Sequence, residues 1–134
     1  MRIIKFRGKS IDGELPNGEE LYGNFVYGNL LLHKNGVYRI LVPIDGGFEN
    51  YKVAPHTVGQ FTSLYDCHGK EIYEGDILNF NGLKIEVRFV RGVFALLCNG
   101  DLDNELCGDC RTDMFAKVIG NIHDNPELLK GGEE

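Results

Sequence analysis

The sequence predicts a mainly β protein that forms one domain, and two observations carry this prediction. Asn-Gly pairs begin at Asn35, Asn81 and Asn99, each beside an apolar run of strand length, and Asn-Gly is a strong signal for a tight hairpin turn. The 18 glycines are spread along the 134 residues rather than gathered in a low-complexity stretch. A chain of this length buries about two-thirds of its unfolded surface, so its stability requires neither a disulfide nor a metal ion.

The first expected strand covers residues 2–11, where apolar and basic side chains alternate. Ile4 and Phe6 would face the interior, and Lys5, Arg7 and Lys9 would face solvent. We interpret these cations as protection of an edge strand against pairing with another chain. The alternative is a small basic set with Arg2 that binds nucleic acid weakly, through phosphate contacts that salt weakens.

Residues 14–24 form a polar stretch with little to bury, and we expect a mobile loop there. Strands are predicted over residues 25–28 and 30–33, and a turn at Asn35-Gly36 returns the chain into a strand over residues 37–42. A further strand over residues 48–53 follows Asp45-Gly46-Gly47. Pro55 ends it, because proline cannot donate to a sheet ladder.

The stretch over residues 57–77 has the densest turn chemistry in the chain. Asp66 and Gly69 occupy the first and fourth positions of an expected type I turn. Gly75 tolerates a positive φ and so favours a second bend, after which Asp76 would accept backbone N–H groups. The pattern predicts a strand, a bend and a second strand.

Residues 76–98 predict a three-stranded meander with a type I′ turn at Asn81-Gly82 and another turn at Arg91-Gly92. The middle strand would point Ile85, Val87 and Phe89 inward and Lys84, Glu86 and Arg88 outward. Residues 93–98 are apolar on both faces, which indicates a central strand or one buried from two sides.

A long acidic connection is expected over residues 101–113, on the surface. A last strand over residues 116–122 would close the sheet. Asn125 as N-cap and Pro126 at the first helical position begin a short helix that reaches Lys130, and residues 131–134 form a frayed tail.

Cys107-Gly108-Asp109-Cys110 is the one motif with intrinsic metal or redox chemistry. A structural zinc site needs four ligands, and the candidates that would complete it are Cys67, Cys98, His68 and His123, at spacings that match no standard finger. The motif also does not stand at the strand-to-helix junction typical of redox enzymes. We therefore favour an inert loop and expect no metal.

The carboxylates of Glu71, Glu74 and Asp76 lie close together in sequence, as an acid–base pair would. We favour a structural interpretation instead, in which Asp76 follows a bend and stabilises it by accepting backbone N–H groups. No nucleophile elbow and no phosphate-binding glycine loop accompanies the histidines. The sequence predicts a protein that is not an enzyme, without catalytic or cofactor-binding residues.

The net charge of −6 is concentrated near the C-terminus: residues 1–98 hold 11 basic and 11 acidic side chains, and residues 99–134 hold 3 and 9. An acidic protein is a poor match for phosphate backbones, so we do not expect nucleic acid as the main partner. The N-terminus lacks the apolar core of a signal peptide, and no run approaches the length of a membrane span. We expect a cytoplasmic protein with reduced thiols and no membrane partner.

Three blocks of the sequence carry a family resemblance. The central one is Thr57-Val58-Gly59-Gln60-Phe61-Thr62 with Asp66 and Gly69-Lys70-Glu71-Ile72-Tyr73-Glu74-Gly75-Asp76-Ile77; the others are residues 4–9 and 118–129. Together they resemble the YopX family of phage and prophage proteins. Ser63 departs from the pattern, because the family more often has Gly there, and so do Cys67 and His68, where polar residues such as Lys-Asn are usual.

The resemblance implies a mainly β fold with an SH3-like small barrel in the C-terminal half, and no established reaction. It implies one YopX-like domain over residues 1–134: an N-terminal β-hairpin region over residues 1–56, the SH3-like region over 57–125, and a short helix and tail over 126–134. The protein would work in the cytoplasm of a bacterial host as a phage or prophage accessory protein.

We expect this accessory protein to act by binding or by self-assembly, as a homo-oligomer or with a host or phage protein. A weak nucleic-acid-binding SH3-like module and a zinc protein remain the alternatives. Residues 93–97 must be internal or covered by a neighbouring copy, because no charged side chain guards them. Alternatively, residues 116–122 and 126–129 cover them within one chain, with Leu128 and Leu129 as plugs.

Overall fold

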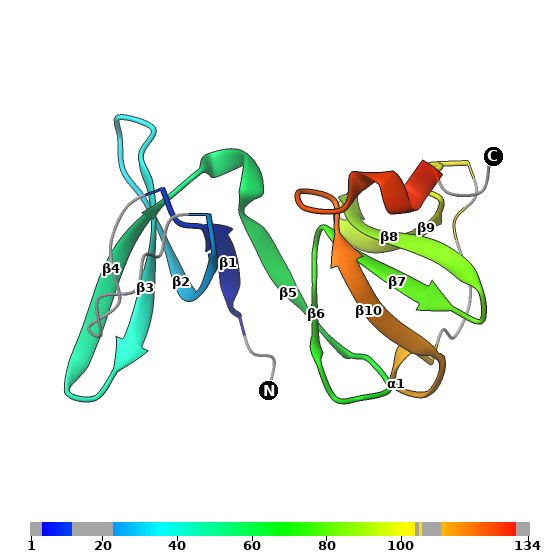
Figure 1. Cartoon of the computed structure of the whole chain (residues 1–134). Helices are drawn as coiled ribbons and strands as arrows, with labels where there is room; N and C mark the ends of the chain where they lie inside the picture. Colours follow the sequence, from blue (N-terminus) through cyan, green and yellow to red (C-terminus); the bar gives the residue numbers. More distant parts are fainter. Residues whose placement is uncertain (1–3, 12–22, 104, 106–110, 131–134) are drawn as a thin grey trace. The chain divides into compact units, whose positions relative to one another are not determined.

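The structure is a computed structural model that describes residues 4–11, 23–103, 105 and 111–130 (Figure 1). Most of the described residues lie in antiparallel strands, so the mainly β prediction is confirmed. The expected mobile loop and the C-terminal tail lie outside the described residues, apart from Gly23 and Asn24. The strands are β1 (Phe6–Lys9), β2 (Phe25–Leu32), β3 (Tyr38–Ile44), β4 (Gly47–Val53), β5 (Gly59–Tyr65), β6 (Glu71–Tyr73), β7 (Asp76–Phe80), β8 (Leu83–Val90), β9 (Val93–Cys98) and β10 (Ala116–Asn121).

The chain forms two compact units, Met1–Phe61 and Thr62–Glu134, each with its own buried cluster. In the first unit the strands follow the order β4-β3-β2-β1-β5. One face of this sheet packs Val26, Ile40, Tyr51 and Val53 into a core. A 3-10 helix, η1 (Pro55–Thr57), leads from β4 to β5, as expected for a strand that ends before Pro55.

Strand β2 changes its pairing partner at Gly28. Gly28 lies opposite Phe6 of β1, and the next residue, Asn29, lies opposite Leu41 of β3. At this point a Cβ on Gly28 would meet the carbonyl oxygen of Leu41 at 2.0 Å. The backbones of β2 and β3 therefore approach so closely that only glycine fits.

The interpretation of β1 as an edge strand is wrong. β1 pairs with β2 on one side and with β5 on the other, so both of its edges are occupied. Arg7 is only 5% exposed, and its guanidinium carbon lies 4.2 Å from the centre of the Phe25 ring. The Lys9 ammonium donates to the Gly23 carbonyl at 2.9 Å and lies 4.6 Å from the same ring. These cations pack on an aromatic side chain instead of guarding an edge.

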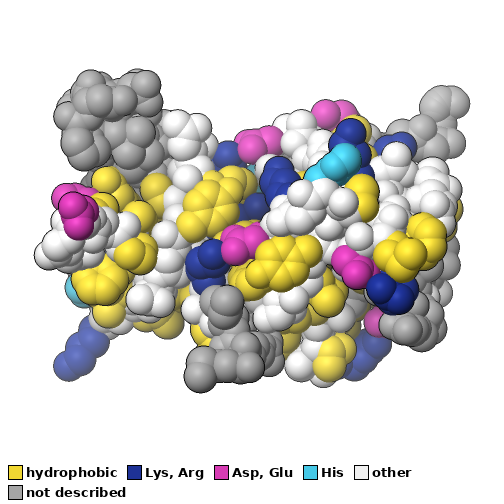
Figure 2. All heavy atoms as spheres, turned by 90° about the horizontal axis from the view of Figure 1, so that it is seen from below, with side chains coloured by type: hydrophobic (Ala, Val, Ile, Leu, Met, Phe, Trp, Pro, Cys, Tyr) yellow, Lys and Arg dark blue, Asp and Glu magenta, His cyan; other side chains and the backbone are white. Residues whose placement is uncertain are grey.

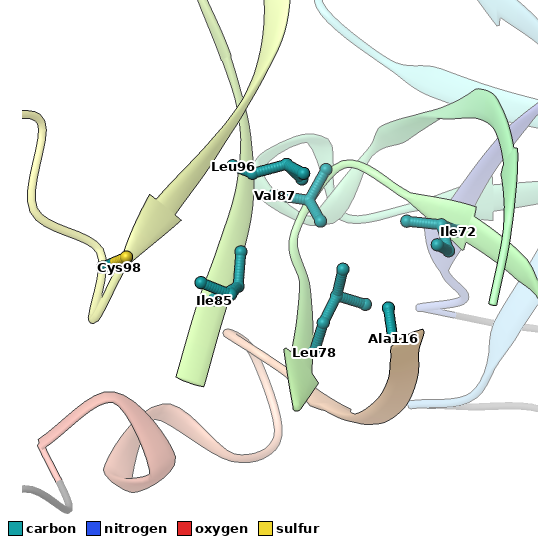
Figure 3. Packing of buried hydrophobic residues seen from close by; sticks show 7 residues of the cluster. All are labelled: Ile72, Leu78, Ile85, Val87, Leu96, Cys98 and Ala116. Carbon is teal, nitrogen blue, oxygen red and sulfur yellow. The ribbon is translucent and has the colours of Figure 1, made fainter. Parts of the chain in front are cut away.

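The second unit contains a four-stranded sheet in the order β10-β7-β8-β9. Two-residue turns join its meander at Asn81-Gly82 and Arg91-Gly92, and all four residues have positive φ, as the type I′ prediction for Asn81-Gly82 requires. Figure 3 shows the core of this unit, in which Ile72 of β6 joins side chains from all four strands. Among the described strands β9 and β10 do not pair with each other, so the SH3-like barrel stays a prediction.

Two side chains of β8 differ from the alternating pattern. Glu86, expected outside, is 5% exposed, and Phe89, expected inside, is 49% exposed. Arg88 holds the buried carboxylate with two hydrogen bonds, from Nε at 3.0 Å and Nη2 at 2.6 Å, and Nη2 also donates to the Gly100 carbonyl. Phe89 packs edge-to-face on Phe94 at 5.0 Å near the end of the hairpin, where the core has ended.

The C-terminal elements agree with the sequence except at one point. A four-residue helix, α1 (Thr112–Phe115), begins at the end of the expected acidic connection and continues past it, and the sequence did not predict this helix. β10 and the 3-10 helix η2 (Pro126–Lys130) follow as expected. The Asn125 carbonyl accepts the Leu128 N–H in the first turn, but its side-chain oxygen accepts the Asn121 N–H and so fastens η2 to β10.

Ser63 gives the first testable prediction. Its φ of 73° lies in the left-handed region, which costs a residue with a Cβ about 1–2 kcal/mol and glycine much less. Because the extra flexibility of glycine in the unfolded chain offsets part of this gain, Ser63→Gly should raise the free energy of unfolding by about 0.5–1 kcal/mol. Chemical denaturation would measure it. Ser63→Ala, which keeps the strain, is the control, and equal stability of the two variants would contradict the explanation.

Candidate interaction surface

The Asp66 carboxylate of the central motif accepts three backbone N–H groups. Its Oδ1 accepts the N–H groups of His68 and Lys70 at 2.9 Å, and its Oδ2 accepts the N–H of Val118 at 3.0 Å. The Gly69 N–H donates to the Asp66 carbonyl, so the predicted turn is confirmed. Burial by itself would raise the pKa of Asp66, but the hydrogen bonds from Val118, Lys70 and His68 outweigh it and hold the pKa below its ordinary value.

The Asp66 turn covers the outer edge of β10. Besides the bond from Val118 to the carboxylate, the Cys67 N–H donates to the Ala116 carbonyl at 2.8 Å. The other carboxylates also have structural partners: Asp76 accepts the Tyr73 N–H at 2.8 Å, and Glu71 accepts the Tyr73 hydroxyl at 2.8 Å. The turn-stabilising interpretation of Asp76 is confirmed. The carboxylates of Asp66, Glu71 and Asp76 in the central motif therefore stabilise the fold through hydrogen bonds.

The cysteine and histidine candidates for a zinc site do not come together in the described part of the chain. Cys107 and Cys110 lie outside the described residues. Cys98 is buried in the core of the second unit, whereas Cys67 is exposed on the Asp66 turn, and both are free thiols. Over residues 4–11, 23–103, 105 and 111–130, no group of three or more His, Cys, Asp or Glu side chains lies close enough to hold a metal ion.

The three strands β2, β3 and β4 expose the sheet face that points away from their core. We call this the outer face. The hydrogen bond from Arg39 Nη1 to Asn50 Oδ1, at 3.2 Å, joins two of its members across β3 and β4. Strand register places nine side chains on it: Tyr27, Asn29, Leu31, Arg39, Leu41, Pro43, Phe48, Asn50 and Lys52.

The outer face combines apolar side chains with cations. Phe48 is 59% exposed, Tyr27 is 42% exposed and Leu31 is 38% exposed. Arg39 and Lys52 lie opposite each other in the pairing of β3 with β4, and Leu31 lies opposite Arg39. None of the nine side chains is acidic, although the chain as a whole carries a net charge of −6. Exposed apolar side chains of this kind mark surfaces that bind other molecules.

Exposed hydrophobic side chains also occur elsewhere, and Figure 2 shows them in several separate groups on the side that it displays. The outer face differs because its members share one face of three adjacent, paired strands. Sequence reasoning missed it. The signal was the mixed character of residues 38–44, where Tyr, Ile and Val on one face alternate with Arg, Leu and Pro on the other, so that neither face is fully polar.

Known proteins identify the family of this chain. The family model for the YopX protein matches residues 27–130, which include most of both units. The chain belongs to the YopX family. No curated protein matches it.

Two solved structures have a fold similar to that of this YopX family member. Protein EF1440 from Enterococcus faecalis is 25% identical, with 95% of this chain and 98% of that chain covered and a TM-score of 0.56. Protein yopX from Bacillus subtilis is 16% identical, with 99% and 100% covered and a TM-score of 0.57, a likeness that shows the fold alone.

In this YopX family member, the last four residues of the apolar strand β9 are buried without a second copy, whereas Val93 at its start is 58% exposed. Ala95, Leu96 and Leu97 are buried, and Leu97 forms an isolated bridge with Glu105. Leu128 and Leu129 of η2 are half-buried. Residues 95–97 therefore give little reason for self-association, and the outer face replaces this strand as the candidate. Within the described residues, no helix has the length and hydropathy needed to cross a membrane.

Proposed function

We propose that this YopX family member acts by binding and self-association, without catalysis, as a phage or prophage accessory protein in the bacterial cytoplasm. The observation that carries the proposal is the outer face, with its exposed Phe48, Tyr27 and Leu31 on adjacent strands. A closed homo-oligomer is the common way for proteins to bury such a surface. The family membership supports the accessory role.

The SH3-like barrel belongs to this proposal as the scaffold of the second unit. The meander of β7, β8 and β9, with β10 on β7 and one core between them, supports it. The nucleic-acid alternative has less support, because two of its four cations have other contacts: Arg7 is buried, and Lys9 contacts Gly23 and Phe25. The zinc alternative rests on Cys107 and Cys110, outside the described residues.

The test is the mass of the protein in solution. By sedimentation velocity the wild-type chain should have a multiple of 15.0 kDa that depends on concentration. Phe48→Asp should reduce the mass to that of one chain, because a charge would be buried in the contact. Circular dichroism should remain that of a β protein.

Leu83→Asp is the matched control. Leu83 is 48% exposed and lies at the start of β8, outside the outer face, so its substitution should leave the mass unchanged. A wild-type chain that sediments at 15.0 kDa at every concentration would refute self-association. It would shift the proposal to a monomer that binds a host or phage protein.

A further inference from the structure

A second exposed feature complements the outer face in both charge and hydropathy. After β9 and the pair Asn99-Gly100, the side chains of Asp101, Leu102 and Asp103 are all exposed, and Leu102 is 52% exposed. We call these three residues the acidic turn. The Asp101 N–H donates to the Cys98 carbonyl at 3.0 Å, and the Asp101 carboxylate accepts the Asp103 N–H at 2.9 Å. These bonds hold an apolar side chain between two carboxylates at the end of a strand.

Charge decides how two copies would meet. If two outer faces packed on each other, Arg39 and Lys52 of each copy would meet no carboxylate, because none of the nine side chains of the outer face is acidic. The acidic turn offers the opposite arrangement. Its two carboxylates match the two cations, and Leu102 matches the exposed Leu31, which lies opposite Arg39 on the outer face.

We propose that the acidic turn of one copy docks on the outer face of a second copy, with Leu102 against Leu31 and the two aspartates beside Arg39 and Lys52, which lie in the same row of paired residues. The inference rests on the proposed self-association and specifies its geometry. Because two different surfaces meet, the contact is head-to-tail, and repetition of it gives a ring or a filament instead of a symmetric dimer.

A charge-swap experiment tests this arrangement. Arg39→Glu places a carboxylate on the outer face, and the double variant Asp101→Lys, Asp103→Lys reverses the charge of the acidic turn. Each variant alone should sediment at 15.0 kDa, since each opposes like charges across the contact. An equimolar mixture should regain the wild-type mass, because each altered surface finds its complement and each unaltered surface does too.

Two controls separate charge from damage to the fold. Arg39→Gln removes the cation without reversing it and should weaken assembly less than Arg39→Glu does. Asp113→Lys with Glu127→Lys makes the same change in net charge at two exposed positions outside the acidic turn and should keep the wild-type mass. Raising the salt concentration should weaken the wild-type assembly, because screening acts on exposed ion pairs.

The outcomes distinguish the inference from the proposed function. If the wild-type chain remains at 15.0 kDa, self-association itself fails. If Phe48→Asp and Arg39→Glu dissociate the assembly while the double lysine variant keeps the wild-type mass, the outer face assembles but the acidic turn is not its occupant. If both charge reversals dissociate it and the mixture fails to recover, the two surfaces do not contact each other.

Discussion

Substitution of Gly28 by alanine should lower the free energy of unfolding by about 3 kcal/mol or more, at the upper end of what overpacking a folded protein costs. A Cβ at this position would lie 2.0 Å from the Leu41 carbonyl oxygen and 2.9 Å from its carbon. The closest C–H···O contacts between strands are about 3.3 Å, so β2 and β3 would have to separate by more than 1 Å. The obstacle is backbone, and no side-chain rotation relieves it.

Gly47→Ala is the control for this prediction. Gly47 begins β4 in the same unit, and an added Cβ there meets no atom within 4 Å. Its substitution should be neutral or slightly stabilising, because alanine has less freedom than glycine in the unfolded chain. Urea denaturation of both variants provides the measurement. An ordinary substitution lowers the free energy of unfolding by about 1 kcal/mol. If Gly28→Ala lowered it by no more than about 1 kcal/mol, the two strands would not approach this closely.

Substitution of Asp66 by asparagine should lower the free energy of unfolding by about 2–3 kcal/mol at neutral pH. The amide can still accept N–H groups through its oxygen, but its NH₂ group would face another donor. If the amide oxygen still accepts the N–H groups of His68 and Lys70, the NH₂ group faces the Val118 N–H. The hydrogen bond to β10 is then lost, because both groups are donors. Hydrogen bonds to a charged acceptor are also stronger than those to a neutral one.

The difference between wild type and Asp66→Asn should depend on pH in a definite direction. The folded pKa of Asp66 is lowered, so its carboxylate stabilises the fold above the unfolded pKa of about 3.9, and this contribution is lost as pH falls through the folded pKa. Denaturation at pH 7 and below pH 4 should therefore show the two proteins converging. Glu49→Gln, which removes an exposed carboxylate on β4, should show no such convergence. A difference independent of pH would exclude the carboxylate as its cause.

Much of the local structure was readable from the sequence because neighbouring residues determine it. Asn81-Gly82 specifies a turn that needs two positive φ angles, and both occur. Asp66 and Gly69 close the predicted turn through the bond from the Gly69 N–H to the Asp66 carbonyl. The mainly β class and the family follow from the same short-range patterns and the central motif.

The partners of those elements were decided by the tertiary structure. The Asp66 carboxylate accepts the N–H of Val118, which is 52 residues away in the sequence. No local sequence pattern predicts that contact. β1 was predicted as an edge strand, but it lies between β2 and β5. Its cations Arg7 and Lys9 therefore pack on the Phe25 ring and do not protect an edge. Glu86 can be buried because Arg88 donates two hydrogen bonds to its carboxylate, and the Gly100 carbonyl accepts a further bond from the same guanidinium. The outer face and the acidic turn likewise became visible only once strand register had assigned each side chain to a face. Turn chemistry and alternation act over a few residues, whereas pairing, burial and exposure depend on which distant segments the chain brings together.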